Sequence, residues 1–164
     1  MEIGELKISK RECGGCTACC YAPQIITPPY EKEHFTNCIF CTNTGCSIYE
    51  NRPSLCQDFS CDWQRKILDK DKKPNEIGIL TYIRNLSYGK CMICFEIEEG
   101  SFKKDKFKEI INFCLENNIY LLCFSKDKDP IYYFKRKDLR KRPKNIEYTF
   151  GKFAEVKDVS ELLN

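Results

Sequence analysis

Hydrophobic and polar positions show a regular period only in the C-terminal two thirds of the chain. Runs rich in β-branched and aromatic residues predict strands over Ile77–Arg84, Lys90–Glu98, Ile119–Ser125, Ile131–Lys135 and, as a fifth, Glu147–Phe153. A stripe with the period of a helix lies between the second and third strands and predicts a helix over Lys103–Asn117; it consists of Phe107, Ile110, Ile111, Cys114 and Leu115. The order ββαββ predicts an α+β fold with a mostly antiparallel sheet and one packed helix.

The N-terminal part lacks long periodic segments and predicts short helices joined by loops. Thr27 and the two prolines after it favour a helix start, which predicts a short helix over Tyr30–Phe35. Arg52 and Pro53 favour a second short helix that carries Cys56. A part with so many loops buries little apolar area, and small folds of this kind usually need a metal or disulfides.

The polar stretch Asp69–Pro74 predicts a linker, so we expect two domains, residues 1–73 and 74–164. The chain of 164 residues is 42% hydrophobic and 31% charged, which is typical of globular proteins. No apolar run is long enough to span a membrane, and the first residues lack the apolar core of a secretory signal. We therefore expect a cytoplasmic protein without a membrane partner.

Cysteine is the outlier of the composition, with 13 residues against one histidine. An odd count argues against a fully paired disulfide framework, and thiols in a reducing compartment usually serve metals or redox chemistry. Nine cysteines lie in the N-terminal part: Cys13, Cys16, Cys19, Cys20, Cys38, Cys41, Cys46, Cys56 and Cys61. The other four fall on predicted core positions, where we expect them to pack as small hydrophobic residues: Cys91, Cys94, Cys114 and Cys123.

The run Cys13-x2-Cys16-x2-Cys19-Cys20 is the sharpest chemical signal. Two cysteines in the spacing C-x2-C bend back onto one ion, and structural zinc takes four thiolates, or thiolates with histidine. The same run supplies three of the four ligand positions of a bacterial 4Fe–4S site. Both zinc and an iron–sulfur cluster therefore remain open.

Neighbouring Cys19 and Cys20 are expected to point in different directions, so that one of them packs or the two serve separate centres. Cys38-x2-Cys41 is a second C-x2-C pair. The single histidine, His34, is a further candidate ligand, but a lone histidine is more often a surface or capping residue.

Taken together, the cysteine pattern resembles a known family. Cys13-x2-Cys16-x2-Cys19-Cys20 is followed by Gly45-Cys46-Ser47-Ile48-Tyr49-Glu50, Arg52-Pro53 and Cys56. This pattern, over about residues 11–65, is similar to that of the YkgJ-like cysteine-cluster family, described as CxxCxxCC zinc- or iron-chelating proteins. A flagellin lysine methylase carries a similar domain with an iron–sulfur cluster.

The resemblance implies a set of metal ligands, namely Cys13, Cys16, Cys19, Cys20, Cys38, Cys46, Cys56 and Cys61. Cys41 stands where the family more often has an apolar residue and is an additional candidate. Arg52 either donates to backbone carbonyls, balances the negative thiolates or forms a salt bridge at the rim. Tyr49 either packs over the centre, donates a hydrogen bond beside it or packs in the core.

The function expected from the sequence is therefore a metal-binding protein that holds zinc or a 4Fe–4S cluster. One alternative is an iron–sulfur-dependent enzyme for redox or S-adenosylmethionine-linked group transfer, although no nucleotide-binding motif supports it. A readily exchanging metal chaperone or buffer is another. A third is nucleic-acid binding through the basic stretch Lys135–Lys144, which follows aromatic Tyr132, Tyr133 and Phe134. A solvated strand end and loop is the favoured interpretation of that stretch, because 17 acidic residues offset the 22 basic ones within residues 62–164.

Overall fold

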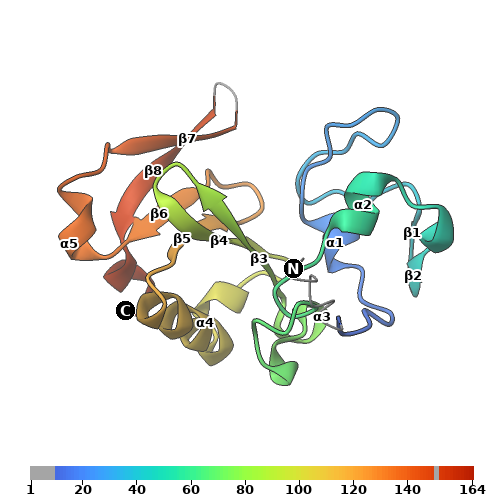
Figure 1. The fold of residues 1–164 in the computed structure, drawn as a ribbon, viewed down its shortest axis with the longest axis horizontal. Helices are drawn as coiled ribbons and strands as arrows, with labels where there is room; N and C mark the ends of the chain where they lie inside the picture. Colours follow the sequence, from blue (N-terminus) through green and yellow to red (C-terminus); the bar gives the residue numbers. More distant parts are fainter. Residues whose placement is uncertain (1–9, 150–151) are drawn as a thin grey trace, which may run out of the picture.

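The computed structural model describes residues 10–149 and 152–164 as a loop-rich N-terminal part and a six-stranded sheet (Figure 1). The α-helices are α1 (Ala18–Tyr21), α2 (Ser54–Asp58), α3 (Pro74–Ile77), α4 (Asp105–Glu116) and α5 (Arg136–Leu139). The strands are β1 (Cys41–Thr42), β2 (Gly45–Cys46), β3 (Ile79–Leu86), β4 (Gly89–Glu96), β5 (Tyr120–Phe124), β6 (Ile131–Phe134), β7 (Asn145–Thr149) and β8 (Lys152–Asp158). Four 3₁₀ turns are described at Tyr49–Asn51, Lys70–Lys72, Ser101–Lys103 and Val159–Leu162.

The large sheet has the strand order β3-β4-β5-β6-β8-β7. β3–β4, β5–β6 and β7–β8 are antiparallel, whereas β4–β5 and β6–β8 are parallel. The α+β fold predicted from the sequence is confirmed, and the sheet is mixed. The reason is that α4 connects β4 to β5, and a crossover of this kind places the second strand parallel to the first.

The predicted fifth strand, Glu147–Phe153, corresponds to two strands. β7 and β8 flank residues 150–151, which lie outside the described residues. The two strands pair antiparallel, with Ile146 opposite Ala154. None of the helices in the described part of the chain is long and apolar enough to cross a membrane.

One face of the sheet is covered by α4, as the helical stripe predicts. Four stripe residues are fully buried: Phe107, Ile110, Ile111 and Cys114. They share a hydrophobic cluster with Met92 of β4 and Leu121 of β5. Burying a large apolar side chain contributes about 1.5–3 kcal/mol, so this layer is a main source of stability.

The alternation along β4 separates the cysteines of the sheet. Cys91 packs into the cluster on one face, whereas Cys94 packs into the cluster on the face of α4. Cys114 and Cys123 also lie on the α4 face, and all four thiols are buried. The prediction that these cysteines pack in the core is confirmed, and two residues on opposite faces of a sheet do not share one metal ion.

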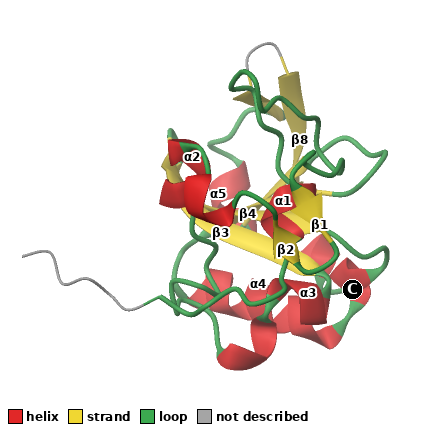
Figure 2. Cartoon of the chain, turned by 90° about the vertical axis from the view of Figure 1, so that its right-hand side faces the viewer, coloured by secondary structure: helices red, strands yellow, loops and turns green. Residues whose placement is uncertain are grey.

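The N-terminal part packs on the other face of the sheet. Ala18 and Trp63 share a hydrophobic cluster with Leu80 of β3 and Phe95 of β4. Figure 2 shows α1 and the β1–β2 hairpin in front of the sheet, with α3 and α4 below it. The division into domains at residue 73 stays a prediction, but the shared cluster joins the two parts through one core.

The helix predicted over Tyr30–Phe35 is wrong. Ile25 and Lys32 form an isolated antiparallel bridge with 2.9 Å hydrogen bonds in both directions. The backbone N–H of Tyr30 donates to the carbonyl of Thr27 over 2.9 Å, which closes a turn. The prolines therefore reverse the chain rather than begin a helix. The short helix predicted after Arg52 is confirmed as α2, which begins at Ser54.

The linker expected over Asp69–Pro74 is a packed segment. The Lys72 side chain is only 7% exposed, and its Nζ lies 2.7 Å from the Glu109 carboxylate of α4 and 3.2 Å from that of Asp71. Lys106 of α4 also pairs with Asp71 and Glu109, at 2.5 and 3.3 Å. A lysine that binds two carboxylates from different elements fixes this segment to α4.

Replacing Lys72 with alanine should lower the free energy of unfolding by about 1 kcal/mol at neutral pH, because the two carboxylates lose a shared donor. Hydrogen bonds from Lys106 and Lys72 hold the pKa of Asp71 below its usual value, and those from Lys72 and Lys106 do the same for Glu109. Stability from a depressed carboxyl pKa exists above the unfolded-state pKa and is lost as the pH falls through the folded-state pKa.

The difference in the free energy of unfolding between the wild type and Lys72→Ala should therefore shrink below about pH 4. Urea unfolding at neutral and acidic pH measures it. Lys108→Ala is the matched control, because Lys108 pairs with the 93% exposed Asp105 on its own helix. An equal loss of stability in Lys72→Ala and Lys108→Ala would contradict a specific role of Lys72.

Candidate metal centre

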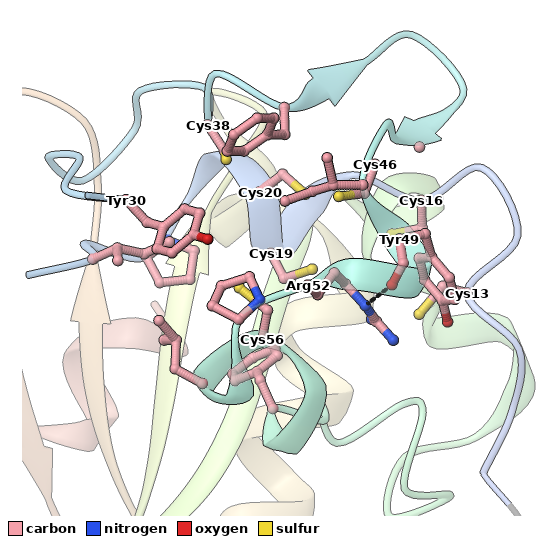
Figure 3. Close-up of a pocket in the computed structure, with 18 of the residues that line it drawn as sticks. Cys13, Cys16, Cys19, Cys20, Tyr30, Cys38, Cys46, Tyr49, Arg52 and Cys56 are labelled. Atoms are coloured by element: carbon pink, nitrogen blue, oxygen red, sulfur yellow. Dashed lines mark hydrogen bonds between the residues drawn. The ribbon is translucent and has the colours of Figure 1, made fainter. Parts of the chain in front are cut away.

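The predicted ligands gather around one cavity of about 190 Å³. Figure 3 shows this cavity with its thiols converging from several segments. Seven of the eight cysteines in the predicted set line it: Cys13, Cys16, Cys19, Cys20, Cys38, Cys46 and Cys56. They come from the loop before α1, from α1, from the loop before β1, from β2 and from α2.

The first C-x2-C turn depends on a glycine. Gly14 has φ +58°, a left-handed conformation that other residues adopt at a cost. The turn closes with a hydrogen bond of 3.2 Å from the backbone N–H of Cys16 to the carbonyl of Cys13. Both thiols then face the same cavity.

Cys19 and Cys20 lie side by side on α1 and both line the cavity. The thiol of Cys19 hydrogen-bonds to the sulfur of Cys20, which raises the pKa of Cys19 and lowers the pKa of Cys20. The expectation that neighbouring cysteines point in different directions is wrong here, because the short helix brings both sulfurs to its cavity side.

The β1–β2 hairpin brings three further cysteines to α1. The backbone N–H of Cys38 donates to the carbonyl of Cys20 over 2.9 Å, and that of Cys41 donates to the carbonyl of Cys38 over 2.9 Å. Cys41 pairs with Cys46 across the hairpin. Its thiol also hydrogen-bonds with Cys20, so Cys41 lies near the predicted ligands although it is outside the cavity lining.

Cys61, the eighth predicted ligand, is buried and does not line the cavity. Burial raises the pKa of its thiol to about 11. The backbone N–H of Gln64 lies 3.4 Å from the sulfur of Cys61, and the side-chain Nε2 of Gln64 lies 3.1 Å from the sulfur of Cys13. Gln64 thus connects Cys61 to the thiols around the cavity.

Arg52 and Tyr49 form a stacked pair at the cavity. The Arg52 Nε donates to the carbonyl of Tyr49 over 2.7 Å, and its guanidinium carbon lies 3.7 Å from the centre of the Tyr49 ring. Burial raises the pKa of Cys13 and of Cys56, and the charge of Arg52 acts in the opposite direction on both. The geometry thus includes both backbone donation and charge balance, as considered for Arg52 from the sequence.

Lys32 is a cation that the sequence analysis missed. Its ammonium group donates to the carbonyls of Tyr21, at 2.9 Å, and of Pro23. Burial lowers the pKa of Lys32, and the nearby thiols Cys38 and Cys20 act in the opposite direction. Lys32 reaches the cysteines because the chain reverses before it, and no local sequence motif announces this placement.

His34 packs against the sheet, away from the cavity. Its imidazole ring lies 5.5 Å from the ring of Phe95 and 4.9 Å from that of Phe124, measured between centroids. Its Nδ1 accepts a hydrogen bond of 3.0 Å from the backbone N–H of Gln24. Burial lowers its pKa. The structure therefore places this candidate ligand among aromatic side chains instead of thiols.

All 13 cysteines lie within the described residues, and all are free thiols. Across residues 10–149 and 152–164, no three side chains of His, Cys, Asp or Glu are arranged to hold a metal ion as they stand. The thiols are gathered but still hydrogen-bonded to one another, as between Cys19 and Cys20. Ligation would deprotonate them and replace those hydrogen bonds.

Searches of protein-family models, curated proteins and solved structures found no match for this chain. The candidate site therefore stands on the arrangement of its own residues.

Replacing Arg52 with glutamine should slow the reaction of the metal-free protein with a disulfide reagent at neutral pH by about twofold to tenfold, because thiolates, and not thiols, react. Loss of the guanidinium removes a positive charge that lowers the pKa of Cys13, Cys20 and Cys56 relative to burial alone. Stopped-flow reaction with a disulfide reagent measures the rate, and the exposed Arg140→Gln serves as control. An unchanged rate in Arg52→Gln would show that its charge does not act on the thiols.

Proposed function

We propose that this chain is a metal-binding cysteine-cluster protein that holds zinc or an iron–sulfur cluster through thiolates of its N-terminal part. The observation that carries the proposal is the convergence of seven free cysteines, distributed from residue 13 to residue 56, on one cavity. The motif resemblance to the CxxCxxCC proteins supports the same ligand set.

The donor set fits these groups. It consists of sulfur, which is the ligand of four-cysteine zinc sites and of iron–sulfur clusters. Seven thiols exceed what one zinc ion needs, so either two zinc ions or one cluster with spare cysteines fits the number.

The chain's own residues would bind and shield the metal. The thiols would ligate it, and Arg52 would offset the negative charge that four thiolates leave on a divalent ion. Zinc would cross-link the loops, whereas an iron–sulfur cluster would also supply one-electron transfer. Because the N-terminal part has short elements, bound metal would contribute much of its folding energy, about 10 kcal/mol for structural zinc.

An iron–sulfur-dependent enzyme is the second candidate. The cavity continues beyond the thiols along aromatic and apolar side chains, including Tyr30, Phe59 and Tyr82, and reaches Arg84 of β3. Small-molecule sites are typically apolar clefts with a few polar groups. This space beside the thiols favours a role in which a substrate approaches the metal.

The nucleic-acid alternative loses its aromatic support. Tyr132, Tyr133 and Phe134 are buried in the sheet at 2%, 8% and 3% exposure, so their rings are not available to stack on bases. Arg142 of the basic stretch lies over the rings of Tyr88 and Phe134, at 4.7 and 5.1 Å from their centres. Residues 136–139 of the stretch form α5 instead of a loop, and Lys137, Arg140, Lys141 and Lys144 are exposed, which fits a solvated surface.

Anaerobic purification of the untagged protein tests the proposal. We expect stoichiometric zinc in a colourless protein, or iron and sulfide with the broad visible absorption of a cluster. Protein that is folded, reduced and free of both metals, and that takes up neither on reconstitution, would contradict the proposal.

Serine at Cys13, Cys16, Cys46 or Cys56 should lower the metal content and destabilise the N-terminal part, because each substitution removes a thiolate ligand. Serine at Cys114 or Cys123 should leave the metal content intact, since these thiols are buried on the α4 face of the sheet. Elemental analysis together with thermal unfolding separates the two classes. If the variants at Cys114 and Cys123 lost the metal and the other four variants kept it, the ligand assignment would be wrong.

A further inference from the structure

Cys61 raises the question of which thiols it joins, because it is buried outside the cavity lining. Gln64 contacts both the sulfur of Cys61 and the sulfur of Cys13. Its side-chain Nε2 lies 3.1 Å from the Cys13 sulfur, and its backbone N–H lies 3.4 Å from the Cys61 sulfur. One residue thus directs two donors at two sulfurs that are 48 positions apart in the sequence.

Arg11 holds the segment that carries Gln64. The backbone N–H of Arg11 donates to the carbonyl of Gln64 over 2.9 Å. The guanidinium of Arg11 donates to the carbonyls of Trp63 and Leu68, each over 2.7 Å. The backbone of Gln64 is therefore held in place by Arg11, and its N–H faces the Cys61 sulfur.

Hydrogen bonds to a charged group favour its charged form, and donors beside metal ligands orient them and tune the centre. Both donors of Gln64 point at sulfur. The side chain of Gln57, by contrast, donates to the backbone carbonyl of Arg52. Cys13 and Cys16 are also close enough to Cys61 to act on it electrostatically. Cys61 therefore lies near Cys13 and Cys16, and Gln64 contacts two of these three thiols.

We propose that Gln64 is a positioning residue of the proposed metal centre, and that it joins Cys61 to the centre ligated by Cys13 and Cys16. The inference rests on the proposed function and adds a residue that the cysteine motif does not contain. Cys61 then acts as a ligand from outside the cavity lining, oriented by the same residue that orients Cys13.

Titration of the full-length, metal-free protein with Co²⁺ tests this under anaerobic conditions, in competition with a chelator. The charge-transfer absorption from thiolate to Co²⁺ reports sulfur ligation. Gln64→Met removes the side-chain donor to Cys13 at similar size, and Gln64→Glu replaces it with an acceptor that repels thiolate. We expect Co²⁺ to bind about 10-fold more weakly to the first and up to about 100-fold more weakly to the second.

Gln57→Met is the matched control, because the Gln57 amide donates to the backbone carbonyl of Arg52 and not to sulfur. It should titrate as the wild type does. Near-ultraviolet circular dichroism of each variant checks the fold of the sheet. A merely structural role of Gln64 would lower the unfolding midpoint while leaving the Co²⁺ affinity of the folded protein unchanged, and this result would overturn the proposal.

A double-mutant cycle with Cys13→Ser sharpens the test. If Gln64 acts through Cys13, Gln64→Met should have little further effect on Co²⁺ affinity once that thiol is gone, whereas independent sites would give additive losses. Additive losses would overturn the inference and leave the proposed function intact. A wild-type protein that binds no Co²⁺, zinc or iron would overturn both.

Discussion

A thiolate in a partly buried space costs free energy unless a positive charge faces it. The N-terminal third of this chain collects nine thiols within such a space and its immediate surroundings. Burial raises the pKa of Cys13, Cys56 and Cys61, so without a cation these groups stay protonated at neutral pH. Cys20 is the exception, because the hydrogen bond from Cys19 lowers its pKa to about 6; the other three thiols become thiolates only with further positive charge beside them.

The protein supplies part of that positive charge from separate segments. Arg52 stacks on Tyr49 beside the cavity, and Lys32 reaches the thiols from the reversed chain after Ile25. Lys73 acts on Cys13 from the segment before α3. These side chains are too few to balance every cysteine as a thiolate, and this shortage of positive charge is the physical argument behind the proposed metal ion or cluster.

The sequence predicted the sheet part well because its signals are local. The helical stripe and the strand runs act over neighbouring residues, and α4 with β3 to β6 lies close to where the periodicity places it. The parallel pairing of β4 with β5 follows from the α4 crossover, and that of β6 with β8 from the segment with α5 and β7 between them; no single run encodes either. Seven of the eight cysteines that the family resemblance implies as ligands line one cavity; C-x2-C spacing alone would not have included Cys46 or Cys56. Lys32 and Gln64 were not predictable, since their contacts depend on tertiary packing.

The failures share one cause. The pattern after Thr27 fits a helix start locally, yet the bridge between Ile25 and Lys32 satisfies the backbone in another way. Lys72 is charged and predicts a solvated linker, yet Asp71 and Glu109 bind its ammonium group in a nearly buried position. In each case, a contact with a residue outside the segment, Ile25 or Glu109, overrides the preference that the local sequence indicates.

The segment from Cys61 to Gln64 shows how the thiols and the sheet are coupled. Asp62 lies along the outer edge of β3: its backbone N–H donates to Thr81, and its carboxylate accepts from the backbone of Ile83, both over 2.9 Å. Trp63 packs in the shared cluster, and Gln64 donates to the sulfurs of Cys61 and Cys13. Because Asp62 is bonded to β3 directly after Cys61, the edge of the sheet fixes the position of Cys61. The sheet therefore serves as the rigid support against which the cysteines of the short loops and helices would close around a metal.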